Sequence, residues 1–274
     1  MKNPQDLNEK ILWAKLYSDT SQWVTLADKY RVRDYVERKG LGDCLVKLYG
    51  AWDDVKKFDF DQLPENFILK ANNGDGKGTN MPVRGKSQLT ATQKADIIKT
   101  MNEWLHRKNI GILHAEPHYK EMHPMVIAEE LLPLPKGESS LEDYKLWCFN
   151  GKVRYIYTCS NRASDGVSIQ AMLYDREWNA FPQHLVSNSN YQVGKVVTKP
   201  KNLKKMIEVA ETLAAGFPEL RVDLYNMNPD DENGKIYFGE LTFTSLGGLM
   251  YYFTPEFLKE AGSLFSIEDF KRKF

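Results

Sequence analysis

Two acidic residues and an arginine in the C-terminal part of the chain have types and spacing that suit metal-assisted chemistry. The segment RVDLYNMNPDDENGKIYFGEL, residues 221–241, contains two strand-like runs, with Arg221 and Asp223 in the first and Glu240 in the second. On paired strands the two carboxylates would repel each other unless a cation lies between them. A divalent metal such as Mg²⁺ prefers such oxygen ligands. A solvated hairpin is the alternative, and this segment alone does not decide between them.

A lysine and a glycine-rich loop earlier in the chain suit a phosphate group. Lys70 ends the apolar run NFILK and is followed by NNGDGKG, residues 72–78. Glycine lets backbone N–H groups approach phosphate oxygens, while a lysine ammonium neutralises their charge. The spacing is not that of a Walker A loop, and an ordinary hairpin turn is the alternative. Together with two metal carboxylates, however, this loop predicts a nucleotide triphosphate site.

The composition excludes several classes of protein. The chain has 274 residues, 42% of them hydrophobic, enough for one large domain or two lobes with a sizeable core. Basic and acidic residues both number 37, so no overall field would attract nucleic acid or an anionic membrane. Three scattered cysteines indicate reduced thiols and a cytoplasmic location. No signal peptide or transmembrane segment is expected, because charges interrupt the apolar stretches.

Hydrophobic periodicity predicts the elements that hold these residues. Helices are expected in the first forty residues, from 92 to 108 and from 203 to 217. Strands are expected at 66–71, 81–84 and 125–132, and in a hairpin over 144–160 that turns at Asn150-Gly151. This mixture predicts an α+β protein with antiparallel hairpins in both halves and no Rossmann-type βαβ series.

Taken in order, the segments resemble the TupA-type branch of the ATP-grasp superfamily. The resemblance is carried by LNEKILWAKLY, LADKYRVRDYV, LPENFILKANNGDG, VIAEELL, DYKLWCFNGKV and IYFGELTFTSLGG, from residue 7 to about residue 248. It implies an ATP-grasp fold, in which two α+β lobes sandwich the nucleotide. A small (lid) lobe is expected at 63–135 and a large lobe with the metal site at 136–274. A short helical region at 1–62 would replace a full pre-ATP-grasp domain.

The resemblance also implies roles for individual residues. Those expected to contact the phosphates, adenine or ribose of ATP are Lys29, Lys70, Asn73, Gly74, Gly76, Gly78, Glu129, Glu130, Leu132 and Asp143. Those expected to act on the transferred phosphoryl group are Lys145, Arg162 and Arg221. Those expected to hold Mg²⁺ are Asp223, Glu240 and Thr242. Each role has an alternative. Lys29, Lys145 and Arg162 could be ordinary solvent-facing charges. The segment Glu129 to Leu132 could be a plain strand end, and Asp143 could have a capping or surface role.

The chain departs from the superfamily pattern in two places. Many members follow the metal glutamate with one residue and then asparagine, whereas Glu240 is followed by Leu241 and Thr242. A threonine hydroxyl still offers one oxygen, so a second metal site would be weaker or completed by water. The helical first sixty residues replace a domain that often helps to bind substrate, which leaves recognition of the acceptor unassigned.

The expected activity is ATP-dependent ligation of a carboxylate to an amine through an acyl phosphate. The resemblance implies a uronic acid or glutamyl carboxylate of a glycan precursor in bacterial surface (capsular) polysaccharide synthesis, and an amino acid or small amino compound as the amine. The alternatives are a kinase acting on a sugar, a glycosyltransferase, or a nucleotide-binding module without turnover. The glycosyltransferase is disfavoured because the acidic pair Asp230-Asp231 lies in an expected turn.

Overall fold

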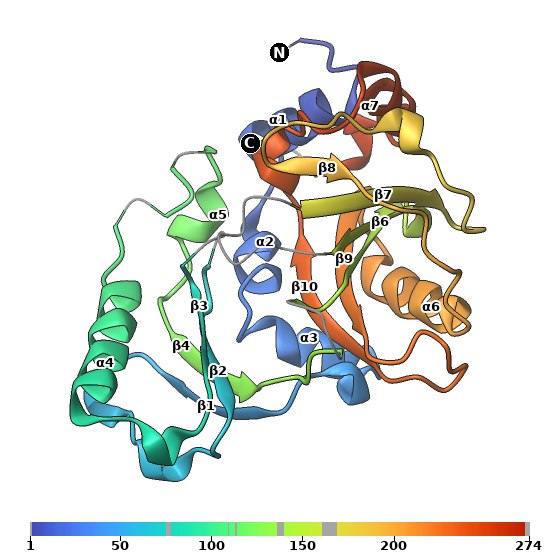
Figure 1. Ribbon diagram of the computed structural model, residues 1–274. Helices are drawn as coiled ribbons and strands as arrows, with labels where there is room; N and C mark the ends of the chain where they lie inside the picture. The colour runs from blue at the N-terminus through green and yellow to red at the C-terminus, as the bar shows by residue number, and fades with distance from the viewer. Residues whose placement is uncertain are drawn as a thin grey trace.

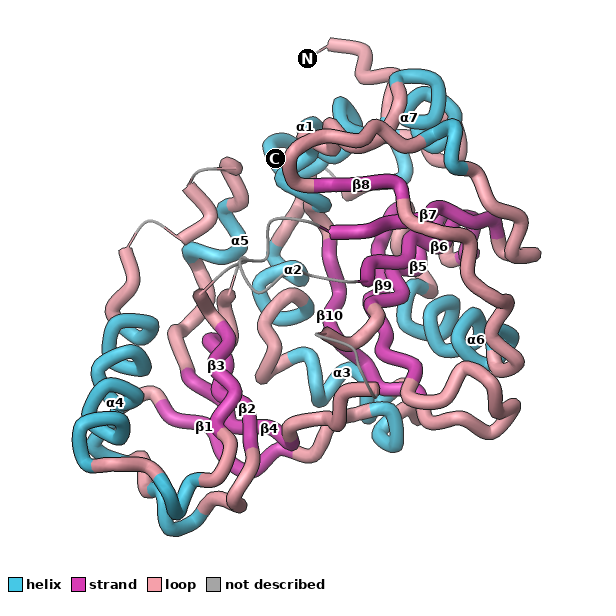
Figure 2. The backbone as a smooth tube through the Cα atoms, viewed as in Figure 1, coloured by secondary structure: helices cyan, strands magenta, loops and turns pink. Residues whose placement is uncertain are grey.

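Two mainly antiparallel sheets organise the chain, and α2 and α3 lie between them (Figure 1). The computed structural model describes residues 2–74, 78–108, 110–112, 114–135, 140–160 and 169–271. The strands fall into two separate groups (Figure 2). The helices are α1 (Leu7–Tyr17), α2 (Ser21–Leu26), α3 (Val32–Arg38), α4 (Ala91–Leu105), α5 (Pro117–Lys120), α6 (Leu203–Ala214) and α7 (Pro255–Gly262). None of these helices is long and apolar enough to cross a membrane.

The smaller sheet turns one face to a helix and the other toward the rest of the protein. Its strands, in spatial order, are β1 (Leu48–Trp52), β4 (Val126–Glu130), β2 (Phe67–Ala71) and β3 (Asn80–Val83). Alternation along β2 buries Phe67 and Leu69 in one apolar core with Met101 of α4. Lys70 therefore lies on the opposite face of the strand, away from that core.

The larger sheet has an apolar face that packs against α6. Its strands, in spatial order, are β10 (Ile236–Thr242), β9 (Glu219–Asn226), β5 (Asp143–Phe149), β6 (Lys152–Ser160), β7 (Ile169–Asp175) and β8 (Tyr191–Val193). Alternate residues such as Leu146, Val222 and Leu224 are fully buried in one core with Met206 and Leu213 of α6. A second core, under α1 and α7, covers part of the other face and includes Trp147, Phe149 and Tyr157.

Local turn chemistry fixes the central hairpin of this sheet. Asn150 and Gly151 connect β5 to β6 with φ values of 50° and 72°. Both residues thus have the left-handed backbone that a two-residue hairpin turn requires, and Asn-Gly is the sequence that adopts it most readily. The expected hairpin is confirmed.

One segment differs from the sequence-based expectation. Residues 48–52, expected within a helical N-terminal region, form β1 at the edge of the smaller sheet, where Gly50 pairs with Ala128 of β4. Every residue of β1 is half-buried, so the strand has no alternation of buried and exposed residues. Its pairing with a distant strand, and not its own pattern, determines its structure.

Candidate functional site

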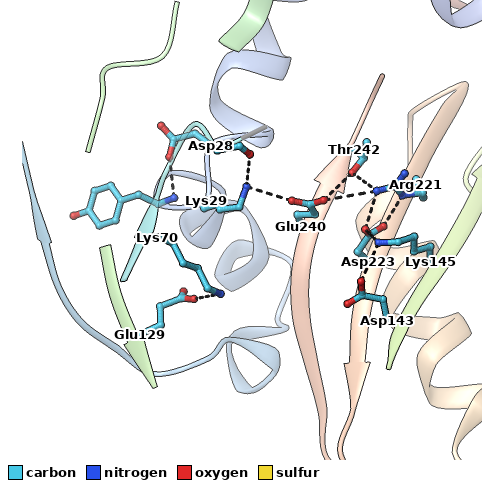
Figure 3. A network of polar contacts seen from close by, with 12 residues as sticks. Asp28, Lys29, Lys70, Glu129, Asp143, Lys145, Arg221, Asp223, Glu240 and Thr242 are labelled. Carbon is cyan, nitrogen blue, oxygen red and sulfur yellow. Dashed lines mark hydrogen bonds and ion pairs between the residues drawn. The ribbon is translucent and has the colours of Figure 1, made fainter. Parts of the chain in front are cut away.

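A row of charged side chains crosses one face of the larger sheet (Figure 3). In the register of the strands, Asp223 of β9 lies opposite Lys145 of β5 and Glu240 of β10. Arg221 lies opposite Thr242. Because directly paired residues share a face, all five side chains lie on the same side of the sheet, opposite the core that contains α6.

A β-bulge at Gly239 brings Glu240 into this row. Phe238 pairs with Leu224 and Glu240 with Asp223, so Gly239 is the additional residue in β10. Such a residue changes the direction of the side chains that follow it. A Cβ atom on Gly239 would lie 3.0 Å from the Asp223 carbonyl oxygen. Glycine therefore permits the close approach that this bulge needs.

Asp223 is held by two cations. The Arg221 guanidinium donates to both of its oxygens, from Nε to Oδ1 at 2.7 Å and from Nη2 to Oδ2 at 2.8 Å, and Lys145 Nζ donates to Oδ2 at 2.6 Å. Burial alone would raise the pKa of Asp223, but the adjacent Arg221 and Lys145 outweigh it and hold the pKa at about 2. The carboxylate is therefore ionised at neutral pH. Arg221 also lies over the Trp147 ring, 5.6 Å from its centroid.

Glu240 connects the row to the N-terminal helical region. Its Oε2 lies 3.3 Å from Lys29 Nζ, its Oε1 lies 3.7 Å from Arg221 Nη2, and the Thr242 hydroxyl donates to Oε1 at 3.5 Å. Burial opposes ionisation, but Lys29 and the other nearby cations lower the pKa of Glu240 overall. The Glu240 side chain is 36% exposed, so it is the more accessible of the two carboxylates.

A second group of charges faces this row across a small recess. Lys70 Nζ donates to Glu129 Oε2 at 2.8 Å, and Arg33 Nη1 donates to Glu129 Oε1 at 3.0 Å. Lys29 Nζ also donates to the carbonyl oxygen of Gly74 at 2.9 Å. The residues that line the recess are Lys29, Arg33, Leu45, Lys70, Glu129, Phe238 and Gly239. The recess thus lies between cations of the helical region and smaller sheet and the β10 edge of the larger sheet.

The expected phosphate loop is only partly described. Asn73 is buried, and its amide nitrogen Nδ2 has no hydrogen-bond partner among the described residues. Gly78 has a φ of 78°, and its carbonyl oxygen accepts a hydrogen bond from Trp104 Nε1 at 2.8 Å. Gly76 lies outside the described residues, as does Arg162. The unpaired amide beside Gly74 is a donor that an anionic ligand could satisfy.

The remaining predicted residues lie at or beyond the end of β4 and at the start of β5. Glu130 ends β4, where its backbone N–H donates to the Lys47 carbonyl oxygen, and Leu132 is buried just beyond. Asp143 begins β5, with Oδ2 3.4 Å from Lys145 Nζ. Arg33 was not among the predicted site residues, although the stretch ADKYRVRD that contains it was assigned to the site through Lys29. Trp147 was not among them either, although β alternation from Lys145 indicates the shared face.

The carboxylates fit a magnesium ion that is bound together with phosphate. Mg²⁺ is typically held by one or two carboxylates, with waters and substrate phosphates completing its octahedral shell. Asp223 and Glu240 are adjacent ionised carboxylates, and the Thr242 hydroxyl lies beside Glu240. Within the described residues, no group of three or more His, Cys, Asp or Glu side chains could hold a metal ion without such additional ligands.

Comparisons with solved structures find similar proteins at low sequence identity. The structure is similar to D-alanine–D-alanine ligase from Bacillus anthracis complexed with ATP, with a TM-score of 0.50 and 14% identity over 94% of this chain and 70% of that chain. Another structure of that ligase gives a TM-score of 0.47 and 13% identity, over 87% of this chain and 65% of that chain. The D-alanine–D-alanine ligase from Helicobacter pylori gives a TM-score of 0.48 and 11% identity, over 99% of this chain and 69% of that chain.

The likeness to these ligases is one of fold, at low identity, and the chain spans about two-thirds of their length. No curated protein matches the sequence. The family model described as TupA-like ATPgrasp matches residues 9–266, nearly the whole chain. Together with the α+β architecture, this match shows that the chain belongs to the TupA-like ATP-grasp family.

Proposed function

We propose that this chain is an ATP-dependent ligase that joins a carboxylate to an amine through an acyl phosphate. The observation that carries the proposal is the cross-strand row, in which ionised Asp223 and Glu240 lie beside the cations Arg221 and Lys145. Such a row can bind a metal–phosphate complex and stabilise negative charge next to it.

Lys29 and Lys70 are proposed to bind the phosphates of ATP. Both ammonium groups border the recess, and each is paired with a carboxylate, Lys29 with Glu240 and Lys70 with Glu129. Phosphate oxygens are anionic acceptors of the same kind and could replace these partners. The unpaired amide of Asn73 would supply a further donor.

Asp223, Glu240 and Thr242 are proposed to hold Mg²⁺, which would neutralise phosphate charge when the nucleotide is bound. The adenine and ribose are proposed to contact the segment Glu129 to Leu132, at and just beyond the end of β4, and Asp143, at the start of β5. Gly74, Gly76 and Gly78 would let backbone N–H groups approach the phosphates. Of these three glycines, Gly74 and Gly78 are among the residues that the structure describes.

Arg221 is proposed to be the main catalytic cation, with Lys145 beside it. Two hydrogen bonds to Asp223, one to Ser245 Oγ at 3.1 Å and the face of Trp147 fix the Arg221 guanidinium before any substrate binds. A charge fixed in advance costs little reorganisation when negative charge develops on the reacting group. Arg162 is proposed to assist there.

In the proposed reaction, a substrate carboxylate takes the terminal phosphoryl group of ATP to give an acyl phosphate and ADP. An amine then attacks the carbonyl carbon and displaces phosphate, which leaves an amide. Positioning and electrostatics supply the catalysis, so a nucleophilic side chain is not required. The family resemblance supports a uronic acid or glutamyl carboxylate of a glycan precursor, an amino acid as the amine, a cytoplasmic location and a role in capsular polysaccharide synthesis.

The test measures ADP release with Mg²⁺ over a panel of uronic acids, nucleotide-linked uronates and amino acids. A ligase releases ADP and free phosphate, whereas a kinase leaves the phosphate on the acceptor. We expect Arg221→Ala to lower kcat by roughly 10²–10³-fold while ATP affinity changes little. Arg154→Ala, which alters an exposed arginine on β6, is the matched control and should behave as the unmodified chain. Full turnover by Arg221→Ala would contradict the assigned role.

A further inference from the structure

The loop that follows β10 contacts the proposed catalytic arginine. Arg221 Nη1 donates to the hydroxyl of Ser245 at 3.1 Å, and Ser245 is fully buried. The next two residues, Leu246 and Gly247, have left-handed backbones, with φ values of 45° and 62°. Leucine rarely adopts such a backbone, so the surrounding structure must hold the loop in this shape.

A buried lysine binds this loop. Lys15 of α1 is 2% exposed, and its ammonium donates to the carbonyl oxygen of Gly247 at 2.6 Å and to that of His114. Lysine is rarely buried to this degree, because removing its charge from water is costly. The His114 segment is also strained, since the next residue, Ala115, has a φ of 50°. Lys15 thus joins two strained loops that lie far apart in the sequence.

A carboxylate from the second loop binds the first loop at its start. Glu116 is 6% exposed and accepts a hydrogen bond from the hydroxyl of Thr244, the residue before Ser245. Burial lowers the pKa of Lys15, and the negative charge of Glu116 opposes this effect. Lys15 and Glu116 thus form a clamp, which holds both ends of the loop.

The loop also packs closely against the segments that carry the clamp. A Cβ atom on Gly247 would overlap the side chain of His114. One on Gly248 would lie 3.1 Å from the carbonyl oxygen of Asn8 on α1. Glycine at both positions permits this close approach. The position of Ser245 is therefore determined by α1 and the His114 segment as well as by β10.

We propose that the Lys15–Glu116 clamp positions the catalytic Arg221 through this loop. The inference rests on the proposed function, in which Arg221 stabilises negative charge on the reacting group. Asp223 binds Nε and Nη2 of the guanidinium, and Ser245 binds the remaining nitrogen, Nη1. Cations that are fixed before the reaction stabilise developing charge better than cations that must first reorient.

A clamp that served the fold alone would not require charged groups. Buried pairs of opposite charge are often no more stabilising than well-packed apolar residues of similar volume. Charged groups differ from apolar ones because they bind individual atoms, here one carbonyl oxygen and one hydroxyl of the loop. Such contacts fix the loop, and with it Ser245, in one arrangement.

The test follows the Arg221 side chain itself and does not depend on turnover. In protein labelled with ¹⁵N-arginine, the Nε–H signal of Arg221 is identified by its absence in Arg221→Lys. Thr244→Val replaces the hydroxyl with a methyl group. We therefore expect the Arg221 signal to shift and its proton to exchange with water about tenfold faster. Lys15→Met should act in the same direction. Thr244→Ser keeps the hydroxyl and should give the signal of the unmodified chain.

Thr158→Val is the matched control, at a buried position on the α6 side of the same sheet. It should leave the Arg221 signal unchanged even where it lowers thermal stability. With a substrate pair that supports ADP release, Thr244→Val should also lower kcat by roughly 10–100-fold with little change in KM for ATP. A displaced Arg221 affects the reacting group, whereas a general loss of structure would impair nucleotide binding as well.

Two outcomes would overturn the inference, whatever the activity of the chain. One is an Arg221 signal that Thr244→Val leaves unchanged. The other is a signal that changes in Thr244→Val and is not restored in Thr244→Ser, because the hydroxyl would then not be the cause. The ligase proposal is judged separately by ADP release. If the Arg221 signal responds as expected while no substrate pair releases ADP, the clamp on Arg221 stands and the ligase function is refuted.

Discussion

Glu219 is predicted to make the protein less stable as the pH rises. This residue of β9 is 3% exposed, and its Oε1 accepts a hydrogen bond from Trp147 Nε1 at 3.1 Å. Burial raises the pKa of Glu219 from its ordinary value of 4.5 to about 8, although Arg221 and the indole N–H both lower it somewhat. At neutral pH, the folded protein therefore holds Glu219 as a neutral carboxylic acid.

The size and sign of the effect follow from this pKa. Between pH 4.5 and 8 the unfolded chain has released the proton and the folded chain retains it, so the free energy of unfolding decreases as the pH rises. At about 1.36 kcal/mol for each unit of pKa difference, this group costs ~4 kcal/mol of stability between about pH 5 and about pH 9. The loss is complete once the pH exceeds the folded-state pKa.

Replacement of Glu219 by glutamine isolates this contribution. The amide is neutral at every pH and keeps an acceptor for Trp147, so Glu219→Gln should match the unmodified chain near pH 5 and exceed its stability by ~4 kcal/mol near pH 9. Urea denaturation at several pH values would measure both. Glu208→Gln, at an exposed position on α6, is the control. Equal stability of Glu219→Gln and the unmodified chain at pH 9 would refute the neutral carboxylic acid.

Three further predictions concern the proposed nucleotide site. Lys70→Ala should reduce calorimetric affinity for an ATP analogue by about 10–150-fold, since a charge-assisted phosphate contact is lost, and unchanged affinity would remove Lys70 from the site. Glu240→Gln should weaken Mg²⁺-dependent binding of the analogue, because a proposed Mg²⁺ ligand is lost. It should not weaken Mg²⁺-free binding, because the substitution removes the anion that competes with phosphate for Lys29. Equal losses with and without Mg²⁺ would contradict this prediction. Gly239→Ala should lower thermal stability by roughly 1–3 kcal/mol and weaken Mg²⁺-dependent binding, and normal values for both would show that the bulge tolerates a Cβ.

Elements with strong local signals were predictable from the sequence. The helix expected from 92 to 108 is α4, and Thr90 caps its N-terminus, since the Thr90 hydroxyl accepts from the Gln93 N–H. The β5–β6 hairpin follows from Asn150-Gly151 in the same way. In both cases neighbouring residues determine the structure, so a single sequence contains enough information.

Features that depend on distant pairing were not predictable. β1 has a glycine at its centre and no alternation, and it forms because β4 offers it an edge. The bulge at Gly239 is equally hidden, because a strand sequence does not show where its register shifts. The shared face of Arg221 and Asp223 followed from a spacing of two residues, but the position of Glu240 opposite Asp223 needed the bulge.

The charge arrangement explains how nucleotide and metal binding could be coupled in this chain. Lys29 and Lys70 are both engaged by carboxylates, and Glu240 is engaged on one side by Lys29 and on the other by Arg221. A phosphate that takes Lys29 would therefore free a Glu240 oxygen, and a freed carboxylate next to phosphate is a ligand that Mg²⁺ prefers. If only the cation or only the carboxylate of such a pair gained a new partner, the other charge would stay in the recess without compensation, which is costly at low exposure. Nucleotide and metal are thus expected to bind this row together, with Asp223 kept in place by Arg221 and Lys145 throughout.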